Sequence, residues 1–160
     1  MRTAVYPGSF DPIHFGHMDI AQRAATLFDR LVVGIYARPD KHLRFTVDER
    51  VALARAVLEP FGNVDVLPYD GLTVELARSL GAQTLVRGLR VISDFEREYQ
   101  MALMNQQLRP HVETICLMTR YEYAFLSASL VKEVFDAGGD VSGMVNPLVL
   151  AALEEKRQTS

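Results

Sequence analysis

The chain has 160 residues, of which 49% are hydrophobic and 23% are charged, and its formal net charge is −3. This length suits one domain with a full core, and the weak negative charge gives no support for bulk binding of nucleic acid. The single cysteine, Cys116, excludes an intrachain disulfide and a cysteine-based zinc cluster. It lies in the apolar run 114–118, so we expect a buried structural thiol. Because no signal peptide or apolar run of membrane-spanning length is found, we expect a cytoplasmic protein.

Strand and helix patterns alternate along the chain. Apolar, β-branched runs predict strands at residues 2–6, 31–36, 64–67, 84–86 and 114–118. Helical spacing predicts helices at residues 18–28, 46–58, 72–80, 94–108, from a cap at Ser127 or Ser129 to residue 135, and from 146 onward, with a frayed polar tail at 154–160. Pro7 and Gly8 are expected to end the first strand. Repeated strand–helix units predict an α/β, Rossmann-like single domain over residues 1–160, with a five-stranded parallel sheet and helices on both faces.

Polar residues gather where ligands of such sheets bind. Ligands bind beyond the carboxyl ends of the strands, near the point where the strand order reverses. The polar residues are Ser9, His14 and His17 after the first strand, Lys41 after the second, Arg87 and Arg90 after the fourth, and Ser127 and Ser129 after the fifth. The third strand is followed by Tyr69, Asp70 and Gly71, which are less distinctive.

His14, Gly16 and His17 form an HxGH motif where a loop meets the start of a helix. A helix N-terminus offers N–H groups and the positive end of the helix dipole to anions such as phosphate. Histidine there can donate hydrogen bonds to phosphoryl oxygens. The alternative is a helix-capping histidine with a structural turn. We favour the functional interpretation because the motif follows a strand and the Gly-Ser-Phe-Asp-Pro segment at residues 8–12.

Two arginines, Arg87 and Arg90, follow an apolar strand and flank a glycine. Arginine offers a planar fork of donors and stays charged, so this pattern suits phosphate binding. The alternative is surface ion pairing with Asp94, Glu96 or Glu98. Lys41 is either a solvated loop lysine or a further cation of the site, and its position after a strand supports the second interpretation.

Two further segments permit two interpretations each. Ser127 and Ser129 stand at a helix start, where they either bind a polyphosphate or act as plain N-caps. Met101, Asn105 and Leu108 recur at helical spacing and are expected to form a core stripe. Asn105 is anomalous on such a face because its amide needs a partner, and a substrate amide would supply one.

Together these segments resemble the bacterial phosphopantetheine adenylyltransferases, a family of HxGH nucleotidyltransferases. The resemblance covers essentially the whole chain, and its carriers are residues 6–17, 45–50, 85–90, 94–105 and 127–134. Residues 94–105 separate this family from its HxGH relatives. The resemblance implies transfer of AMP from ATP to 4′-phosphopantetheine, giving dephospho-coenzyme A and pyrophosphate. It also implies a magnesium-dependent homohexamer.

The same resemblance assigns roles to residues of this chain. His17 would stabilise the transition state at the α-phosphate, with Lys41 and Arg90 as further catalytic residues. The ATP-binding residues would be Ser9, Phe10, His14, His17, Gly88, Leu89, Arg90, Glu98, Tyr123, Ser127 and Ser129. The acceptor-binding residues would be Ser9, Lys41, Thr73, Arg87 and Asn105. Ala128 stands where many members have a hydroxyl residue, so it receives no side-chain role.

The chemistry is compatible with a site that has no general base. A phosphate monoester has a second pKa of about 6, so it is largely dianionic at neutral pH and can attack directly. Positioning and electrostatic stabilisation then suffice, without a covalent intermediate. Magnesium would bridge ATP oxygens and keep most of its waters, so no protein metal ligand is assigned.

Two rival functions remain at this point. One is another HxGH nucleotidyltransferase, which uses nicotinate mononucleotide or CTP, and the helix at residues 94–108 argues against it. The other is a nucleotide-binding regulatory module without catalysis, which needs phosphate contacts to one ligand only. The separated cations Lys41 and Arg87 favour a second anion site and hence an enzyme.

Overall fold

Parallel strands form a five-stranded sheet in the computed structural model, which describes residues 1–40 and 42–159. The strand order is β3-β2-β1-β4-β5, and every neighbouring pair is parallel. The strands are β1 (Thr3–Gly8), β2 (Arg30–Tyr36), β3 (Val64–Tyr69), β4 (Thr84–Leu89) and β5 (Glu113–Met118). The predicted α/β class and the parallel sheet are therefore confirmed.

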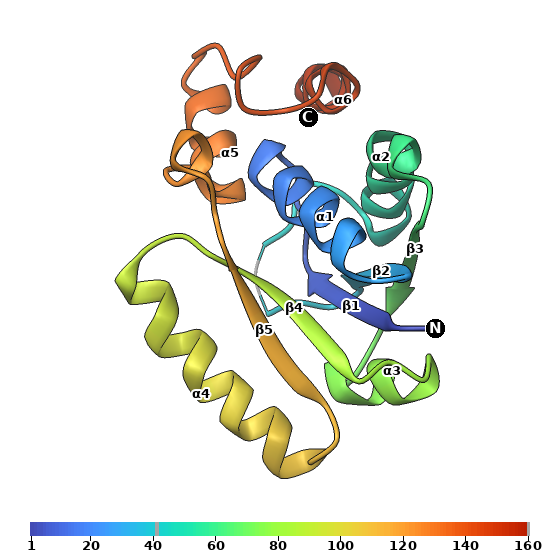
Figure 1. Ribbon diagram of the computed structural model, residues 1–160. Helices are drawn as coiled ribbons and strands as arrows, with labels where there is room; N and C mark the ends of the chain where they lie inside the picture. The colour runs from blue at the N-terminus through green and yellow to red at the C-terminus, as the bar shows by residue number, and fades with distance from the viewer. Residues whose placement is uncertain (41, 160) are drawn as a thin grey trace.

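Helices cover both faces of this sheet, as Figure 1 shows. One side carries α1 (Phe15–Leu27), α2 (Val47–Leu58), α5 (Ala128–Asp136) and α6 (Pro147–Thr159), and the other carries α3 (Thr73–Ser79) and α4 (Ile92–Leu108). Short 3-10 helices are η1 (Glu59–Phe61) and η2 (Tyr121–Tyr123). The larger buried core lies under α1, α2, α5 and α6, and a smaller one lies under α3. Among the described residues, none of the helices has the length and apolar character needed to cross a bilayer.

The strand order reverses between β1 and β4, and these two strands separate early. Strand β1 pairs with β2 along its whole length, from Thr3 to Gly8. It pairs with β4 only at Ala4 and Val5. Beyond Val5 the carboxyl ends of β1 and β4 therefore diverge, which opens a crevice at the switch point.

The first strand is longer than the sequence predicts, because Pro7 and Gly8 continue it. The Pro7 carbonyl oxygen accepts a hydrogen bond from Arg87 Nη1 at 2.7 Å, on the β4 side where the backbone ladder has already ended. A proline at this position removes no ladder hydrogen bond, so it does not break the strand. Strand β4 likewise continues to Leu89, so Arg87 lies within the strand instead of after it.

The predicted frayed tail is wrong for residues 154–159, which continue α6. Lys156 Nζ lies 2.7 Å from a carboxylate oxygen of Glu49 on α2. The Arg157 guanidinium lies over the ring of Phe135, 4.8 Å from its centroid. Charged side chains thus hold the last turns of α6 against α2 and α5, which a polar sequence pattern alone does not reveal.

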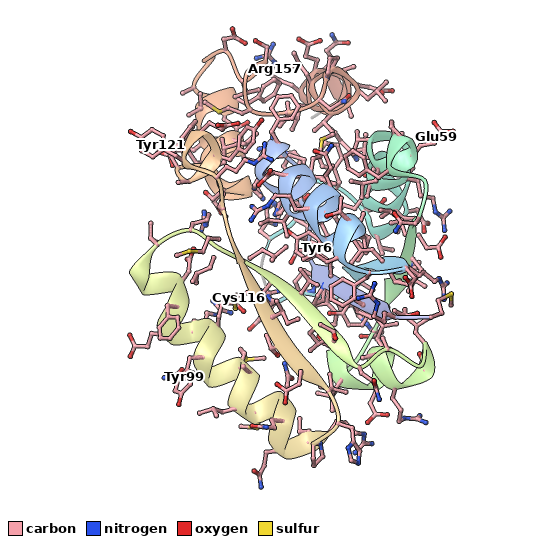
Figure 2. The ribbon with its side chains drawn as sticks, in the orientation of Figure 1. Tyr6, Glu59, Tyr99, Cys116, Tyr121 and Arg157 are labelled. Carbon is pink, nitrogen blue, oxygen red and sulfur yellow. The ribbon has the colours of Figure 1, made fainter. Side chains whose placement is uncertain are left out.

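Two predictions of burial near β5 are also wrong. Cys116 is exposed, because β5 is an edge strand whose faces are only partly covered (Figure 2). The stripe of Met101, Asn105 and Leu108 is not core either, since Met101 is 50% exposed and Leu108 is 39% exposed. No described side chain of α4 is buried.

Candidate active site

A cavity of about 600 Å³ opens at the carboxyl ends of β1 and β4, where the strand order reverses. Its wall brings together side chains that follow several different strands, as the sequence pattern predicts. The predicted site residues on this wall are Ser9, Phe10, His14, His17, Thr73, Arg87, Gly88, Arg90, Glu98, Tyr123, Ser127 and Ser129.

A smaller cavity of about 140 Å³ adjoins the larger one beside α4 and is lined by Asn105. The residues that line both cavities are Pro7, Thr73, Arg87, Arg97 and Glu98. Thr114 lines the smaller cavity, and its buried Oγ1 has no hydrogen-bond partner among the described residues. A buried hydroxyl in this state favours a polar ligand group or a water beside it.

Two predicted site residues are not placed on the cavity wall. The carbonyl oxygen of Leu89 accepts a hydrogen bond from Thr119 N at 2.8 Å, and Leu89 is not among the described residues that line either cavity. Lys41 lies outside the described residues. The structure therefore leaves the role of Lys41 to the sequence argument.

His14 and His17 cap α1 reciprocally through their rings. His17 N donates to His14 Nδ1 at 3.3 Å, and His14 N donates to His17 Nδ1 at 3.2 Å. The two rings are stacked, with centroids 3.6 Å apart. Because Nδ1 accepts in both rings, a neutral ring carries its proton on Nε2, which is a donor. The capping interpretation thus holds, and it fixes the tautomer that a phosphate site needs.

Burial keeps the inner histidine of this pair uncharged. Burial, with the positive charge of Arg90 as a smaller cause, lowers the pKa of His14 from 6.5 to about 3. His14 is therefore a neutral N–H donor at physiological pH. Because its pKa lies far below physiological pH, the hydrogen-bonding pattern of His14 does not change when the pH varies near neutrality.

Gly16 permits the close approach of the His14 ring. A Cβ at position 16 would lie 3.0 Å from Cε1 and 3.1 Å from Nδ1 of His14. These contacts are tighter than ordinary van der Waals distances. The glycine of the HxGH motif is thus explained by the space that the ring takes.

Phe10 supports the same two histidines from the loop after β1. Its φ is 51°, in the left-handed region that bulky residues rarely adopt. In this conformation its ring meets His17 edge-on at 4.8 Å and Tyr6 at 5.3 Å. The loop therefore packs an aromatic ring behind the outer histidine, where a smaller side chain would leave a gap.

Arg87 is held on the opposite wall by a carboxylate of α4. Its Nε and Nη2 donate to the two carboxylate oxygens of Glu98 at 2.9 and 2.8 Å. Burial alone would lower the pKa of Arg87, but the hydrogen bonds and charge of Glu98 outweigh it and raise that pKa above its usual value. The guanidinium is thus charged, oriented and on the wall of both cavities.

Arg90 is held in a similar way. Its Nε and Nη2 donate to the carboxylate of Asp94 at 3.0 and 3.2 Å, and its Nη1 donates to the Leu126 carbonyl at 2.7 Å. Burial raises the pKa of Asp94, but the hydrogen bonds and charge of Arg90 bring it below its usual value. The predicted alternative of arginine ion pairs is therefore realised, and it places both arginines on the cavity wall.

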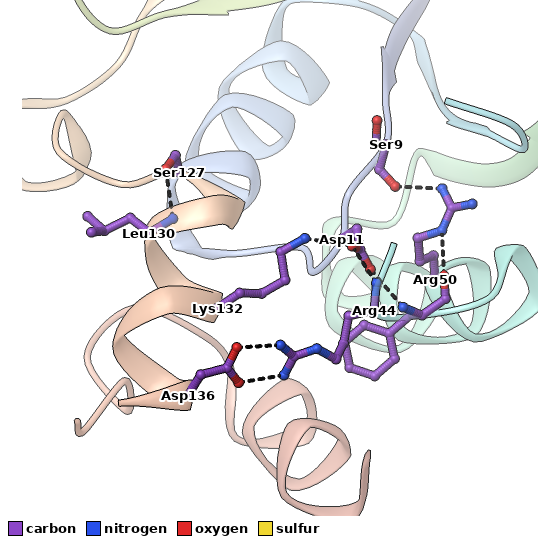
Figure 3. Close-up of polar contacts among 9 residues, drawn as sticks. Ser9, Asp11, Arg44, Arg50, Ser127, Leu130, Lys132 and Asp136 are labelled. Atoms are coloured by element: carbon purple, nitrogen blue, oxygen red, sulfur yellow. Dashed lines mark hydrogen bonds and ion pairs between the residues drawn. The ribbon is translucent and has the colours of Figure 1, made fainter. Parts of the chain in front are cut away.

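The start of α5 closes the cavity on the histidine side. Ser127 is the N-cap of α5, and its Oγ accepts a hydrogen bond from Leu130 N at 3.1 Å (Figure 3). The capping interpretation is therefore confirmed for Ser127. Ser129, the second residue of α5, also lines the cavity. Tyr123 of η2 lies on the same wall.

Sequence reasoning missed polar residues on the floor of the cavity. Tyr69 lies at the end of β3, and its hydroxyl is 2.9 Å from Thr73 Oγ1. Burial raises the pKa of Tyr69 and also that of Tyr6, so both stay protonated phenols. The position of Tyr69 at a carboxyl strand end was a usable signal.

Comparisons with known proteins show the family of the chain. Residues 5–134 match the model of the cytidylyltransferase-like family. The chain is 53% identical over 156 residues to a phosphopantetheine adenylyltransferase of Heliobacterium modesticaldum, and the aligned region covers 98% of this chain and 93% of that protein. It is 49% identical over 156 residues to the phosphopantetheine adenylyltransferase of Alkaliphilus metalliredigens, over 98% of this chain and 99% of that protein.

A third relative has the same name and a similar coverage. The chain is 52% identical over 158 residues to the phosphopantetheine adenylyltransferase of Carboxydothermus hydrogenoformans, over 99% of this chain and 98% of that protein. These matches extend over nearly the whole chain and include the cavity. The chain therefore belongs to the phosphopantetheine adenylyltransferase family of cytidylyltransferase-like nucleotidyltransferases.

Proposed function

We propose that the larger cavity transfers AMP from ATP to 4′-phosphopantetheine, giving dephospho-coenzyme A and pyrophosphate. One observation carries the proposal: the two histidines at the start of α1, Arg87 of β4 and Arg90 directly after β4 line the same cavity at the switch point. This arrangement provides donors for two anionic groups within one site. Membership in the phosphopantetheine adenylyltransferase family supports the same activity.

The histidine wall binds ATP in this proposal. His14 and His17 present Nε2–H donors to the phosphates, and Ser129 and Arg90, which line the same cavity, add further donors to ATP. His17 contacts the α-phosphate and stabilises the charge that develops there. A preorganised donor of this kind acts most strongly on the transition state.

The arginine wall binds the acceptor. Arg87, together with Lys41, holds the acceptor phosphate, and Ser9 lies between this phosphate and ATP. The pantetheine arm extends into the smaller cavity, where Thr73 and Asn105 face its amide groups. Arginine suits a phosphate dianion because it offers two parallel N–H donors and keeps its charge.

The reaction proceeds by direct in-line attack without a covalent intermediate. A phosphate dianion is the nucleophile, so no side chain has to remove a proton from it. An oxygen of the acceptor phosphate forms a bond to the α-phosphorus of ATP, and the bond to the pyrophosphate oxygen breaks. The residues of the chain bring two anions together and stabilise the charge around phosphorus.

Magnesium fits this site as an ion carried by ATP. Among the described residues, no three His, Cys, Asp or Glu side chains are grouped as metal ligands. The carboxylates on the cavity wall, Asp11, Asp94 and Glu98, each bond to a cationic side chain. ATP phosphates and water molecules would therefore hold the ion, as octahedral magnesium usually requires. When bound, it neutralises phosphate charge.

The remaining elements of the proposal concern assembly and location. The family resemblance implies a homohexamer, and exposed apolar side chains on α4 and β5 support burial of this face in an assembly. Phe95, Tyr99, Leu103 and Met118 are 53%, 55%, 49% and 73% exposed, and Tyr99 projects from the side of α4 away from the sheet (Figure 2). Light scattering of the intact chain tests the hexamer, and a monomer would contradict it. The cytoplasmic location that we expect from the sequence stays a prediction.

An acceptor panel tests the activity. The purified chain is incubated with magnesium, either ATP or CTP, and 4′-phosphopantetheine, pantetheine or nicotinate mononucleotide. We expect pyrophosphate and a product of the mass of dephospho-coenzyme A only with ATP and 4′-phosphopantetheine. Turnover of nicotinate mononucleotide, or a preference for CTP, would assign a different reaction. Pyrophosphate without any acceptor would indicate simple hydrolysis of ATP.

A further inference from the structure

Asp11 is a buried carboxylate that the proposed reaction does not use. It lies in the loop between β1 and α1 and is 1% exposed. Its Oδ2 accepts hydrogen bonds from Lys132 Nζ and from Arg44 N, both at 2.8 Å, and its Oδ1 accepts one from Phe45 N at 2.9 Å (Figure 3). A buried charge is costly unless bonds of this kind compensate it, so its presence requires an explanation.

The three bonds of Asp11 join three separate segments of the chain, of which the loop after β1 and the start of α5 line the larger cavity. Asp11 itself follows Ser9 and Phe10 in the loop after β1. Arg44 and Phe45 end the loop 37–45 between β2 and α2, which contains Lys41. Each of the segments is proposed above to contact a substrate.

Lys132 makes the third connection, to α5. It lies one turn after Ser129 on that helix, and its side chain is 19% exposed. Its bond to Asp11 spans 121 positions of sequence, so it fixes the start of α5 relative to the loop that leads into α1. The distance between Ser129 and the histidines therefore depends on this ion pair.

A second buried charge holds the other end of the loop 37–45. Arg50 is 1% exposed and donates to the carbonyl oxygens of Ser9 and Tyr36 at 2.8 Å, and of Ala37 at 3.2 Å. Its Nε donates to the Phe45 carbonyl at 3.3 Å. The loop is thus fixed at both ends by buried side chains, and Asp11 is the one that also reaches α5.

We infer that Asp11 is a positioning residue that couples α5 and the loop 37–45 to the histidine loop, with Lys132 responsible for the ATP half of this coupling. The inference rests on the proposed placement of ATP beside the start of α5. The inference predicts different effects on the two substrates, whereas a purely structural role of these residues would affect both substrates alike. Loss of Lys132 affects ATP alone, whereas loss of the Asp11 charge affects both substrates.

The test compares Lys132→Met with Asp136→Asn by steady-state kinetics, titrating each substrate at saturation of the other. Lys132→Met keeps the aliphatic stem and removes the bond to Asp11. We expect its KM for ATP to rise about tenfold, with the KM for 4′-phosphopantetheine unchanged, because coupled network residues contribute on this scale. Asp11→Asn should raise both KM values.

Asp136→Asn is the matched control because it removes another ion pair between the same helix and the same loop. Asp136 lies one turn after Lys132 and accepts hydrogen bonds from Arg44 at 2.9 and 2.7 Å, but its side chain is 54% exposed. An exposed pair contributes little, so both KM values should stay within about twofold of wild type. Thermal unfolding of every variant shows whether the fold is kept.

Further readouts separate coupling from general damage. The double variant Asp11→Asn, Lys132→Met should have the ATP KM of Asp11→Asn alone, because the first change already breaks the pair. Hydrogen exchange should show that ATP with magnesium protects residues 123–130 in wild type and in Asp136→Asn, but less in Lys132→Met. This readout needs no turnover and remains informative where Asp11→Asn fails to fold.

The inference is overturned if Lys132→Met behaves as Asp136→Asn does, or if it raises both KM values equally. Failure of the proposed function has a different result. Wild type would then make no dephospho-coenzyme A from ATP and 4′-phosphopantetheine, whatever the variants do. The two failures are therefore distinguishable from one set of proteins.

Discussion

The two walls of the cavity are held in place by different interactions. On the α1 wall, His14 and His17 bond to each other's backbone amides, and His14 is 4% exposed. On the α4 wall, Arg87 and Arg90 are oriented by side-chain carboxylates of a helix none of whose described side chains is buried. The first wall is fixed by main-chain geometry and the second by charge pairs.

This difference indicates what each wall can do when substrates bind. The capping bonds hold each histidine ring against a backbone amide at the start of α1, so the Nε2 donors of both rings are oriented before a ligand binds. A phosphate can instead compete with Glu98 or Asp94 for an arginine fork. We therefore expect rate effects from the α1 wall and binding effects from the α4 wall.

His17→Ala should have the largest effect, and on the turnover rate. Loss of a preorganised donor to the transferring phosphate lowers kcat by about 10²–10³-fold, with a much smaller change in the KM for ATP. Steady-state kinetics with ATP titration measure both constants. His111→Ala, in the turn after α4, is the control histidine and should keep normal kinetics. A folded His17→Ala protein with near-normal kcat would refute the preorganised wall.

Arg87→Ala should have the next largest effect, and on acceptor binding. Loss of charge-assisted hydrogen bonds raises the KM for 4′-phosphopantetheine by about 10–100-fold and changes the KM for ATP less. Arg90→Ala should reverse this order. The control is Arg78→Ala, an arginine paired with Glu75 on the surface of α3. Equal shifts in both KM values for Arg87→Ala would show that its wall is structural.

His14 makes the fold itself sensitive to acid, which offers a test of the buried wall. Its pKa falls from 6.5 to about 3 on folding, so below pH 6.5 the unfolded chain binds a proton that the native chain does not. Stability is therefore full above pH 6.5 and is lost as pH falls toward 3. Between pH 7 and 5 the loss due to His14 is about 2 kcal/mol.

Urea unfolding of wild type and His14→Asn at pH 7 and pH 5 measures this contribution. Asparagine keeps an N-cap acceptor but does not titrate, so the variant should lose about 2 kcal/mol less than wild type over this interval. Other titrating groups affect both proteins equally and cancel in the comparison. Equal losses would mean that His14 is solvated in the native state, contrary to a buried and preorganised wall.

Local patterns predicted much of the fold and of the site. Thr46 followed three residues later by Glu49 is the sequence pattern of a helix capping box, and the two residues form one at the start of α2, with bonds of 2.8 and 3.3 Å. The alternation of strands and helices predicted the parallel sheet. The rule that ligands bind beyond the carboxyl ends of parallel strands predicted the position of the cavity. Each of these depends on residues that are close in sequence or on a topology that right-handed crossovers restrict.

The failures arise where a long-range partner decides the outcome. The bond from Lys132 to Asp11 and the pairing of Lys156 with Glu49 join residues more than 100 positions apart, and no local pattern indicates them. The burial of Cys116 was wrong for a related reason. An apolar run looks the same in a central strand and in an edge strand, and β5 is an edge.

Cys116→Ser should have the smallest effect and sharpens the contrast between the two sides of the sheet. Partial desolvation on the side of β5 that faces Glu98, with the charge of Glu98 as a smaller cause, raises the pKa of the Cys116 thiol, so it is a poor nucleophile at neutral pH. Its exposed position on β5 leaves little packing to lose, so we expect normal turnover and a change in unfolding free energy within about 0.5 kcal/mol.

The control variant, Ala24→Ser, places the same hydroxyl in the core under α1, where Ala24 is 0% exposed, and should lower the unfolding free energy by about 1–3 kcal/mol. Urea unfolding compares the two variants. Equal costs would show that β5 is as tightly packed as α1, and abolished turnover in folded Cys116→Ser would give the thiol a chemical role.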